Sequence, residues 1–423
     1  MLGYQKTVLE NGLTLLTVPM RGVSSVTVLV GVGAGSRHES ASKAGLSHFL
    51  EHMALKGTRK RPTPFEVASV IDAIGGESNA GTAKEFTEYW AKVDAGHLEI
   101  AFDLLADNLK EPLFKPEQIE KERRVIIEEI NMYQDLPMRR VLDVFELLLY
   151  GSNPLGRDIA GDKETVSRIR RADFLDHLKK FYQPQKMAVV VAGRFHARRV
   201  RRLAKLYFSD LKKSRGSKIS GKLPPQHQPR AELVYKKTDQ AHFCLGVPGP
   251  SYSHPDRFAV SVTASILGYS RTSRIYRRIR EERGWAYYVQ TTPEYYTDAG
   301  SIYTQAGVSL NKINDSIRLI LAEYRRLQKE KVSSKELQRA KDYIRGRFIL
   351  ALEDSFNVAS RYALQVVVEN KIRTPEETLK LIDAVTVDDV RRVARRFFRP
   401  EKYNLAVIGP YQKKAAFQKL FKN

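Results

Sequence analysis

The stretch FYQPQKMAVVVAGRF at residues 181–195 returns near the other end of the chain as FFRPEKYNLAVIGPY at residues 397–411. Phe, Pro, Lys and Gly recur in both stretches at one offset of 216 positions (397 − 181). Each stretch follows an amphipathic pattern with helical spacing and runs from a proline-bearing turn into an apolar, β-branched run typical of a strand. Because the offset is close to half of the 423 residues, the repeat predicts two homologous domains.

A second repeat supports the same division of the chain. LVGVGAGS from Leu29 resembles CLGVPGPS from Cys244, at an offset of 215 (244 − 29). Between the halves, residues 212–230 are polar and rich in Pro, Gly and Ser, which predicts a linker between domains at 1–211 and 231–423. Strands and long helices are mixed in each half without strict alternation. We therefore expect the α+β class, with a largely antiparallel sheet and helices packed on one face in each domain.

The composition is that of a folded protein with an excess of basic residues. The formal net charge is +23, and Cys244 is the single cysteine. The basic residues lie among apolar residues at helical spacing without a nucleic-acid-binding motif, so we expect no nucleic acid as partner. No stretch approaches the roughly 20 apolar residues of a membrane helix, so we expect no membrane either. The N-terminus is typical of two strands joined at Glu10-Asn11-Gly12 rather than of a signal peptide. Together with the lone cysteine, this pattern predicts a cytoplasmic protein.

The segment GLSHFLEHMALKGT, from Gly45, concentrates histidine and glutamate within an apolar surrounding. Its composition predicts a helix from about Lys43. His48 and His52 are then four residues apart on the same face as Glu51. Two imidazoles at this spacing can bind one zinc ion, and the carboxylate can reach a water beside the metal, as in the H-x-x-E-H pattern. The alternative is a hydrogen-bonded His–Glu cluster in a core.

A catalytic zinc site requires a third protein ligand and a position left for water. The next glutamate-rich helical pattern is IEKERRVIIEEINMY at residues 119–133. Glu122 and Glu129 fall within its apolar stripe, whereas Glu128 projects to the opposite, exposed side. Carboxylates directed at a core need cationic partners, and a metal with its histidines is one such partner. We therefore predict Glu129 as the third ligand, with one zinc ion per chain. Glu122 is predicted to hold the ligands in position without binding the metal.

The segments HFLEHMALKGT and ERRVIIEEI resemble the inverzincin metallopeptidases of the pitrilysin, insulysin and mitochondrial processing peptidase type. GAGSRHE from Gly33, GGESNAGT from Gly75 and PLGRDIAG from Pro154 are also similar. The spacing of 77 positions from His52 to Glu129 (129 − 52) is close to that of the family. The resemblance covers essentially the whole chain. It implies zinc ligation by His48, His52 and Glu129, with Glu51 as the general base.

The resemblance also implies residues that contact the substrate. Asn79 and Ala80 match an edge strand beside the zinc, which would bind an extended peptide by β-addition; the alternative is an ordinary strand after the Gly75-Gly76 turn. Arg280 and Tyr287 match an element that faces the zinc from the opposite domain and hydrogen-bonds the substrate backbone and the developing oxyanion. Taken alone, residues 274–282 predict an amphipathic helix with solvated arginines, ended by Gly284.

Together these features predict a zinc-dependent endopeptidase that hydrolyses unfolded peptides or small polypeptides. The family encloses its site in a chamber between two halves, and a two-domain chain forms half of such a clamshell. A homodimer would complete the chamber, and a heteromer with an inactive homologue is the competing assembly. The alternatives are a non-catalytic, processing-peptidase-like subunit and, from a different class, a basic nucleic-acid-binding protein.

Overall fold

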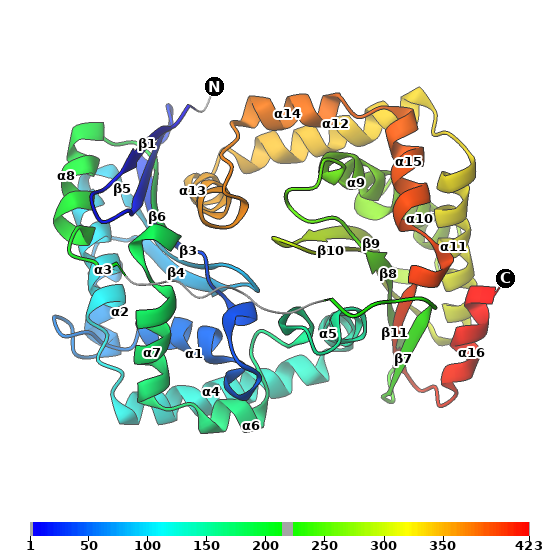
Figure 1. The fold of residues 1–423 in the computed structure, drawn as a ribbon, viewed down its shortest axis with the longest axis horizontal. Coiled ribbons are helices and arrows are strands. Elements are labelled where there is room, and N and C mark those ends of the chain that lie inside the picture. The colour runs from blue at the N-terminus through cyan, green and yellow to red at the C-terminus, as the bar shows by residue number, and fades with distance from the viewer. Residues whose placement is uncertain (1–2, 214–222, 423) are drawn as a thin grey trace. The chain divides into compact units, whose positions relative to one another are not determined.

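The computed structural model describes residues 3–213 and 223–422, which divide into two compact units (Figure 1). Unit 1 comprises Met1–Asn131, Arg157–Ser220 and Ile349–Glu376; unit 2 comprises Met132–Gly156, Gly221–Phe348 and Glu377–Asn423. Each unit contains one β-sheet with helices packed against it, so the predicted α+β class is confirmed. Residues 214–222 of the predicted linker lie outside the described residues, and its last residue, Arg230, begins strand β7.

The sheet of unit 1 has six strands in the order β1-β2-β6-β3-β5-β4. The strands are β1 (Gln5–Val8), β2 (Thr14–Pro19), β3 (Ser25–Val32), β4 (Glu77–Thr82), β5 (Thr87–Asp94) and β6 (Met187–Gly193). The β2–β6 pair is parallel, and the other neighbours are antiparallel. The predicted hairpin at Glu10-Asn11-Gly12 joins β1 to β2, and Gly12 adopts the left-handed φ of 89° that this turn requires.

The sheet of unit 2 repeats this arrangement in the order β7-β11-β8-β10-β9. Its strands are β7 (Arg230–Tyr235), β8 (Gln240–Pro248), β9 (Ala286–Tyr295), β10 (Gly300–Ser309) and β11 (Asn404–Gly409). Taken in chain order, β2 to β6 correspond to β7 to β11, and the one parallel pair, β7–β11, corresponds to β2–β6. The repeated stretches of sequence form β6 and β11, which are buried along their whole length. The internal repeat is therefore a repeat of topology.

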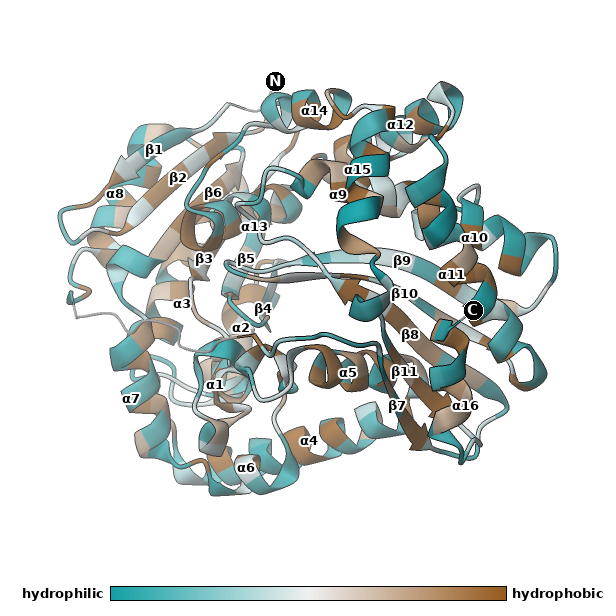
Figure 2. Ribbon diagram, turned by 45° about the vertical axis from the view of Figure 1, so that its right-hand side comes forward, coloured by the Kyte–Doolittle hydropathy of each residue, from teal (hydrophilic) through white to brown (hydrophobic). Residues whose placement is uncertain are grey.

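Helices cover the sheets in both units. The helices before β7 are α1 (Leu46–Ala54), α2 (Pro64–Asp72), α3 (Leu98–Lys110), α4 (Pro116–Asp135), α5 (Pro137–Tyr150), α6 (Lys163–Arg168), α7 (Arg171–Phe181) and α8 (Ala197–Phe208). Those after β8 are α9 (Arg257–Ala264), α10 (Arg274–Tyr276), α11 (Ile313–Lys329), α12 (Ser334–Ala351), α13 (Ser355–Leu364), α14 (Pro375–Asp383), α15 (Val387–Phe397) and α16 (Lys414–Gln418). Figure 2 shows β8 and β11 as largely hydrophobic, whereas α15 carries hydrophilic and hydrophobic bands. This amphipathic pattern lets α15 bury one side in the core and solvate its arginines on the other.

The main core of each unit lies on one face of its sheet. In unit 1, α3 packs on β3 and α8 packs on β2 and α3, in one core with Val26, Val28 and Val30 of β3. In unit 2, α9, α11 and α15 share a core with Phe243 and Leu245. Among residues 3–213 and 223–422, no helix is both long enough and apolar enough to cross a membrane.

The opposite face of each sheet carries a helix from the other half of the sequence. Helix α13 packs on β3 and β6 of unit 1, although it lies in the C-terminal half of the chain. Helix α5 packs on β8 and β11 of unit 2, although it lies in the N-terminal half. The two halves thus exchange equivalent helices, as Figure 1 shows for α13 beside β3 and α5 beside β8. For this reason the compact units do not coincide with the two halves of the sequence.

Candidate metal centre

The helix that carries the H-x-x-E-H residues begins later than the sequence predicts. Helix α1 starts at Leu46 rather than near Lys43, because Gly45 adopts a left-handed φ of 91° that ends the helix on its N-terminal side. A Cβ atom at Gly45 would lie 2.4 Å from the carbonyl oxygen of Ala160, so the chain is tightly packed there. The carboxylate of Glu39 accepts hydrogen bonds from the backbone N–H groups of Gly45 (2.8 Å) and Ser47 (2.5 Å). Glu39 thereby caps the first turn of α1 and fixes its position.

The apolar side of α1 packs against the apolar stripe of α4 in one buried cluster. The cluster includes Leu46, Phe49, Leu50 and Met53 of α1 and Ile119, Ile126 and Ile130 of α4. Glu129 lies beside Ile130 on α4, and Glu128 points to solvent, as the helical pattern predicts. This packing brings the α4 carboxylate to the imidazoles of α1.

The side chains of His48, His52 and Glu129 converge on one point. Nε2 of His48 lies 3.7 Å from Oε2 of Glu129, and Nε2 of His52 lies 3.6 Å from the same oxygen. One ligand atom from each residue falls within 4.8 Å of the other two. Ligands that bind a tetrahedral zinc ion at about 2.0–2.2 Å lie roughly 3.3–3.5 Å apart. The two histidine–Glu129 distances are close to this spacing, so the donor set fits zinc.

The surroundings of His48 favour the neutral imidazole. Burial, followed by the nearby His52, lowers the pKa of His48, although Glu129 and Glu51 act in the opposite direction. Its Nδ1 atom is buried without a hydrogen-bond partner, so the polar contacts of the ring lie on the Nε2 side. A neutral ring has the free lone pair that metal ligation requires.

Glu122 lies behind His52, on the side away from Glu129. Its Oε2 atom is 3.3 Å from Nδ1 of His52, and its Oε1 atom is 3.0 Å from Nζ of Lys56. Burial raises the pKa of Glu122, but hydrogen bonds from His52 and Lys56 outweigh burial and leave this pKa below its usual value. An ionised Glu122 accepts a hydrogen bond from the Nδ1–H of His52, so the lone pair on Nε2 points towards Glu129.

Lys56 is a member of this cluster that the sequence reasoning missed. It follows the end of α1 and lies four residues after His52, so helical spacing was the signal that could have found it.

Glu51 lies beside the three converging side chains without belonging to them. The group of atoms that could hold a metal contains His48, His52 and Glu129, but not Glu51. The charge of Glu51 nevertheless contributes to the pKa of His48 and of Glu88 on β5. Glu51 therefore lies near His48 but outside the converging donor set.

Asn79 and Ala80 lie on β4, which forms the edge of the sheet in unit 1. Strand β4 runs beside α1, and Oγ1 of Thr82 donates a hydrogen bond to the carbonyl oxygen of Ser47 (3.5 Å). The N–H of Ala80 donates a hydrogen bond to Oδ1 of the preceding Asn79 (2.9 Å). An edge strand thus lies next to the helix that carries the histidines.

Arg280 and Tyr287 lie together in unit 2. Arg280 belongs to the helical segment Arg277–Glu281 that continues α10, and Tyr287 lies near the start of β9. The predicted stop is present at Gly284, which has a φ of 62° and whose N–H donates to the carbonyl of Arg280. The Arg280 guanidinium lies 5.6 Å from the ring centroid of Tyr287 and 5.8 Å from that of Tyr276. Tyr287 is 72% exposed, so its hydroxyl is accessible.

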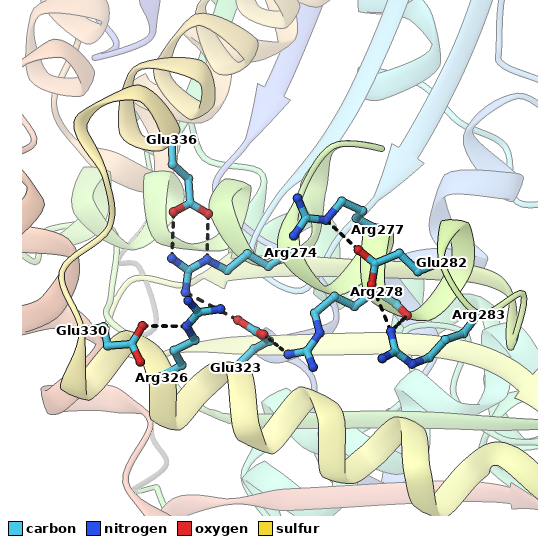
Figure 3. A network of polar contacts seen from close by, with 9 residues as sticks. All are labelled: Arg274, Arg277, Arg278, Glu282, Arg283, Glu323, Arg326, Glu330 and Glu336. Carbon is cyan, nitrogen blue, oxygen red and sulfur yellow. Dashed lines mark hydrogen bonds and ion pairs between the residues drawn. The ribbon is translucent and has the colours of Figure 1, made fainter.

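The expectation of solvated arginines is wrong for two residues of this segment. Arg274 forms two 2.7 Å hydrogen bonds to the carboxylate of Glu336, and its side chain is only 12% exposed. Arg274 and Arg278 also form ion pairs with Glu323, which is buried (Figure 3). Glu323 comes from α11 and Glu336 from α12, so neither partner could be recognised from the segment itself. These ion pairs anchor the segment that presents Arg280.

Comparison with known proteins follows the same division of the chain. The family description "Insulinase (Peptidase family M16)" matches residues 17–163, which include His48, His52 and Glu129. The description "Peptidase M16 inactive domain" matches residues 168–344. An uncharacterized zinc protease of Mycobacterium leprae is 36% identical over 417 residues, covering 97% of this chain and 93% of that protein.

The chain belongs to peptidase family M16. An uncharacterized zinc protease of Bacillus subtilis is 33% identical, covering 95% of this chain and 97% of that protein. The crystal structure of a protease from Helicobacter pylori is similar to this chain with a TM-score of 0.92 at 25% identity, covering 97% of this chain and all of that one. The suspected family and its two-domain fold are therefore confirmed.

Proposed function

We propose that this M16 peptidase is a zinc-dependent endopeptidase that hydrolyses unfolded peptides or small polypeptides. The observation that carries the proposal is the convergence of His48, His52 and Glu129, with Glu51 beside them and outside the donor set. Three protein ligands and an adjacent carboxylate are the arrangement of a catalytic zinc site, whereas structural sites use four protein ligands. We expect one zinc ion per chain.

The residues of unit 1 divide the work of hydrolysis. A zinc ion held there supplies a Lewis acid that lowers the pKa of water and polarises the scissile carbonyl. Glu51 takes the proton of the attacking water as general base and returns it to the leaving amine as general acid. Glu122 holds the ring of His52 in orientation, and Lys56 keeps Glu122 ionised. Each residue thus has one role that can be tested separately.

The edge of β4 supports binding of an extended peptide. An added strand would pair with the backbone of Asn79 and Ala80, so affinity would come from main-chain hydrogen bonds. The N–H of Ala80 would exchange its contact with Oδ1 of Asn79 for a peptide carbonyl.

Arg280 and Tyr287 are the hydrogen-bond donors of unit 2 that would contact the substrate. A guanidinium and a phenol can hydrogen-bond the substrate backbone and stabilise the developing oxyanion. We propose that a second copy of the chain supplies this pair in a closed chamber, which makes a cytoplasmic homodimer sufficient for activity. A heteromer with an inactive homologue is the competing assembly.

A non-catalytic subunit is the second candidate function. It is favoured by the match of residues 168–344 to the description of an inactive domain. That match, however, covers the half of the chain without the H-x-x-E-H residues.

Metal content and peptide cleavage measured together test the proposal. Purified protein should contain about one zinc ion per chain and cleave a mixed peptide pool, and a chelator should abolish cleavage reversibly. His48→Ala should lose both properties, whereas His196→Ala, a change at an exposed histidine of unit 1, should keep both. Bound zinc without any peptide cleavage would favour the non-catalytic subunit. Salt-sensitive retention on nucleic acid that survives zinc removal would instead support the nucleic-acid-binding class.

A further inference from the structure

Helix α13 covers the face of the unit 1 sheet that lies opposite the main core. On β5, Glu88, Trp90 and Lys92 point to this face, and each meets a residue at or near α13. Lys92 contacts Asp354, Trp90 stacks near Phe356 with ring centroids 4.5 Å apart, and Glu88 contacts Ser360. The neighbouring residues Thr87, Tyr89, Ala91 and Val93 are buried on the core side. The alternation fixes the direction in which Glu88 points.

Lys92 and Glu88 have different kinds of partner on this face of β5. Lys92 forms a 2.6 Å ion pair with Asp354. Glu88 accepts a 2.6 Å hydrogen bond from the hydroxyl of Ser360, and among residues 3–213 and 223–422 no ion pair joins Glu88 to a cation. Burial, together with the nearby charge of Glu51, raises the pKa of Glu88. A partly buried carboxylate with a neutral partner and an acidic neighbour is a site that lacks positive charge.

The edge strand leaves a gap in front of this carboxylate. In the antiparallel register, Glu88 lies opposite Gly81 of β4, so both residues belong to the same face of the sheet. A Cβ atom at Gly81 would have only Cγ and Oε1 of Glu88 within 4 Å, both at 3.9 Å. Gly81 therefore places no side chain of its own between Glu88 and the outer edge of β4.

A peptide added to β4 would lie two strand spacings, or about 9.6 Å, from β5. Two long side chains that point to the same face can meet across this distance only where the residue between them is small. We propose that Glu88 forms, over Gly81, a subsite for one lysine or arginine side chain of a peptide bound along β4. This inference names the substrate class of the proposed peptidase and rests on its binding of a peptide by β-addition.

The expected effect is a positional preference for one basic residue. A hydrogen bond between charged groups contributes enough to favour lysine over an uncharged residue of similar length by about tenfold or more. The preference should be confined to one peptide position and should weaken as salt screens the charges.

Binding and cleavage measured separately test the inference. Full-length protein carrying Glu51→Gln binds a fluorescent, uncharged host peptide in which lysine or norleucine occupies each position in turn. We expect the lysine peptide to bind about tenfold or more tightly than the norleucine peptide at one position. Adding Glu88→Gln should bring the ratio of these two dissociation constants close to one. Glu88→Lys should instead favour a peptide with glutamate at that position. Glu77→Gln is the matched control, because Glu77 lies on the same face of β4, roughly 13 Å from Gly81 along the strand.

The wild-type chain supplies the cleavage measurement with the same peptides. A lysine preference that persists in Glu88→Gln, or that Glu77→Gln abolishes equally, overturns the subsite. If the wild-type chain cleaves none of the peptides but the binding preference depends on Glu88, the proposed catalysis fails and the subsite stands. If cleavage occurs without dependence on Glu88, the catalysis stands and the subsite fails.

Discussion

Nδ1 of His52 lies 3.3 Å from Oε2 of the buried Glu122, so that a carboxylate from one helix orients an imidazole on another. The second oxygen of Glu122 contacts Lys56, which keeps the carboxylate charged. The orientation of the His52 ring is thus fixed by two successive contacts, from His52 to Glu122 and from Glu122 to Lys56. The contribution of these contacts can be measured by substituting Glu122, which leaves His48, His52 and Glu129 unchanged.

Glu122→Gln should weaken zinc binding by about 10- to 100-fold while leaving the three ligands in place, because the ring of His52 loses its charged partner. Competition with a chelator of known affinity measures the change. Glu128→Gln is the control, since Glu128 lies on the same helix but is exposed. Equal zinc affinity in the two variants would show that Glu122 does not position His52.

Glu51→Gln should separate metal binding from catalysis. Because Glu51 lies outside the converging donor set, the variant should keep about one zinc ion per chain. Loss of the general base should lower turnover of a peptide by at least 10²-fold. Glu129→Ala, by contrast, should lose zinc and activity together. Near-normal turnover in Glu51→Gln would exclude this residue as the base.

Glu39 should make the stability of the protein depend on pH. Burial raises the pKa of Glu39 from 4.5 to about 7 in the folded protein, against the hydrogen bonds from Ser47 and Gly45. Between these two pH values the folded state retains a proton that the unfolded chain releases. The contribution of Glu39 to the free energy of unfolding is therefore fully present below pH 4.5. It decreases by up to about 3 kcal/mol as the pH rises to 7.

Urea unfolding of zinc-free protein at pH 5 and pH 8 measures this dependence. Glu39→Gln should lose less free energy of unfolding between the two pH values than the wild type, because its amide does not titrate. Glu10→Gln, at an exposed position, should follow the wild type. Parallel losses in Glu39→Gln and the wild type would show that Glu39 is ionised in the folded state.

The sequence predicted the parts of this structure that depend on local pattern. The repeated stretches became the equivalent strands β6 and β11, and the helical pattern at residues 119–133 lies within α4. Apolar periodicity also distinguished the inward-facing Glu122 from the exposed Glu128. These features could be predicted because hydrophobic periodicity, turn residues and repeated stretches are all visible in short segments of the sequence.

The partners that meet across long stretches of chain could not be predicted in this way. Amphipathicity shows that α5 and α13 must each bury one face, but not that each covers the sheet of the other half. Ser360 consequently reaches Glu88 from the other half of the sequence, and no local signal marks the contact. Charge alone likewise gave no indication that Arg274 and Arg278 share the buried Glu323.

The packing of α13 on β3 can be tested at Gly31, where the two elements approach closely. A Cβ atom at Gly31 would lie 2.9 Å from Cβ of Ala363 and 2.9 Å from Cε2 of Phe86, so Gly31→Ala should destabilise the protein by about 1–3 kcal/mol. Gly81→Ala is the matched control, because the nearest atoms to its Cβ would be 3.9 Å away. A double-mutant cycle that adds Ala363→Gly should show a coupling energy of at least about 0.5 kcal/mol, since this second change removes one of the clashing atoms. Strictly additive free energies of unfolding would mean that α13 does not rest on β3, and that the halves do not exchange this helix.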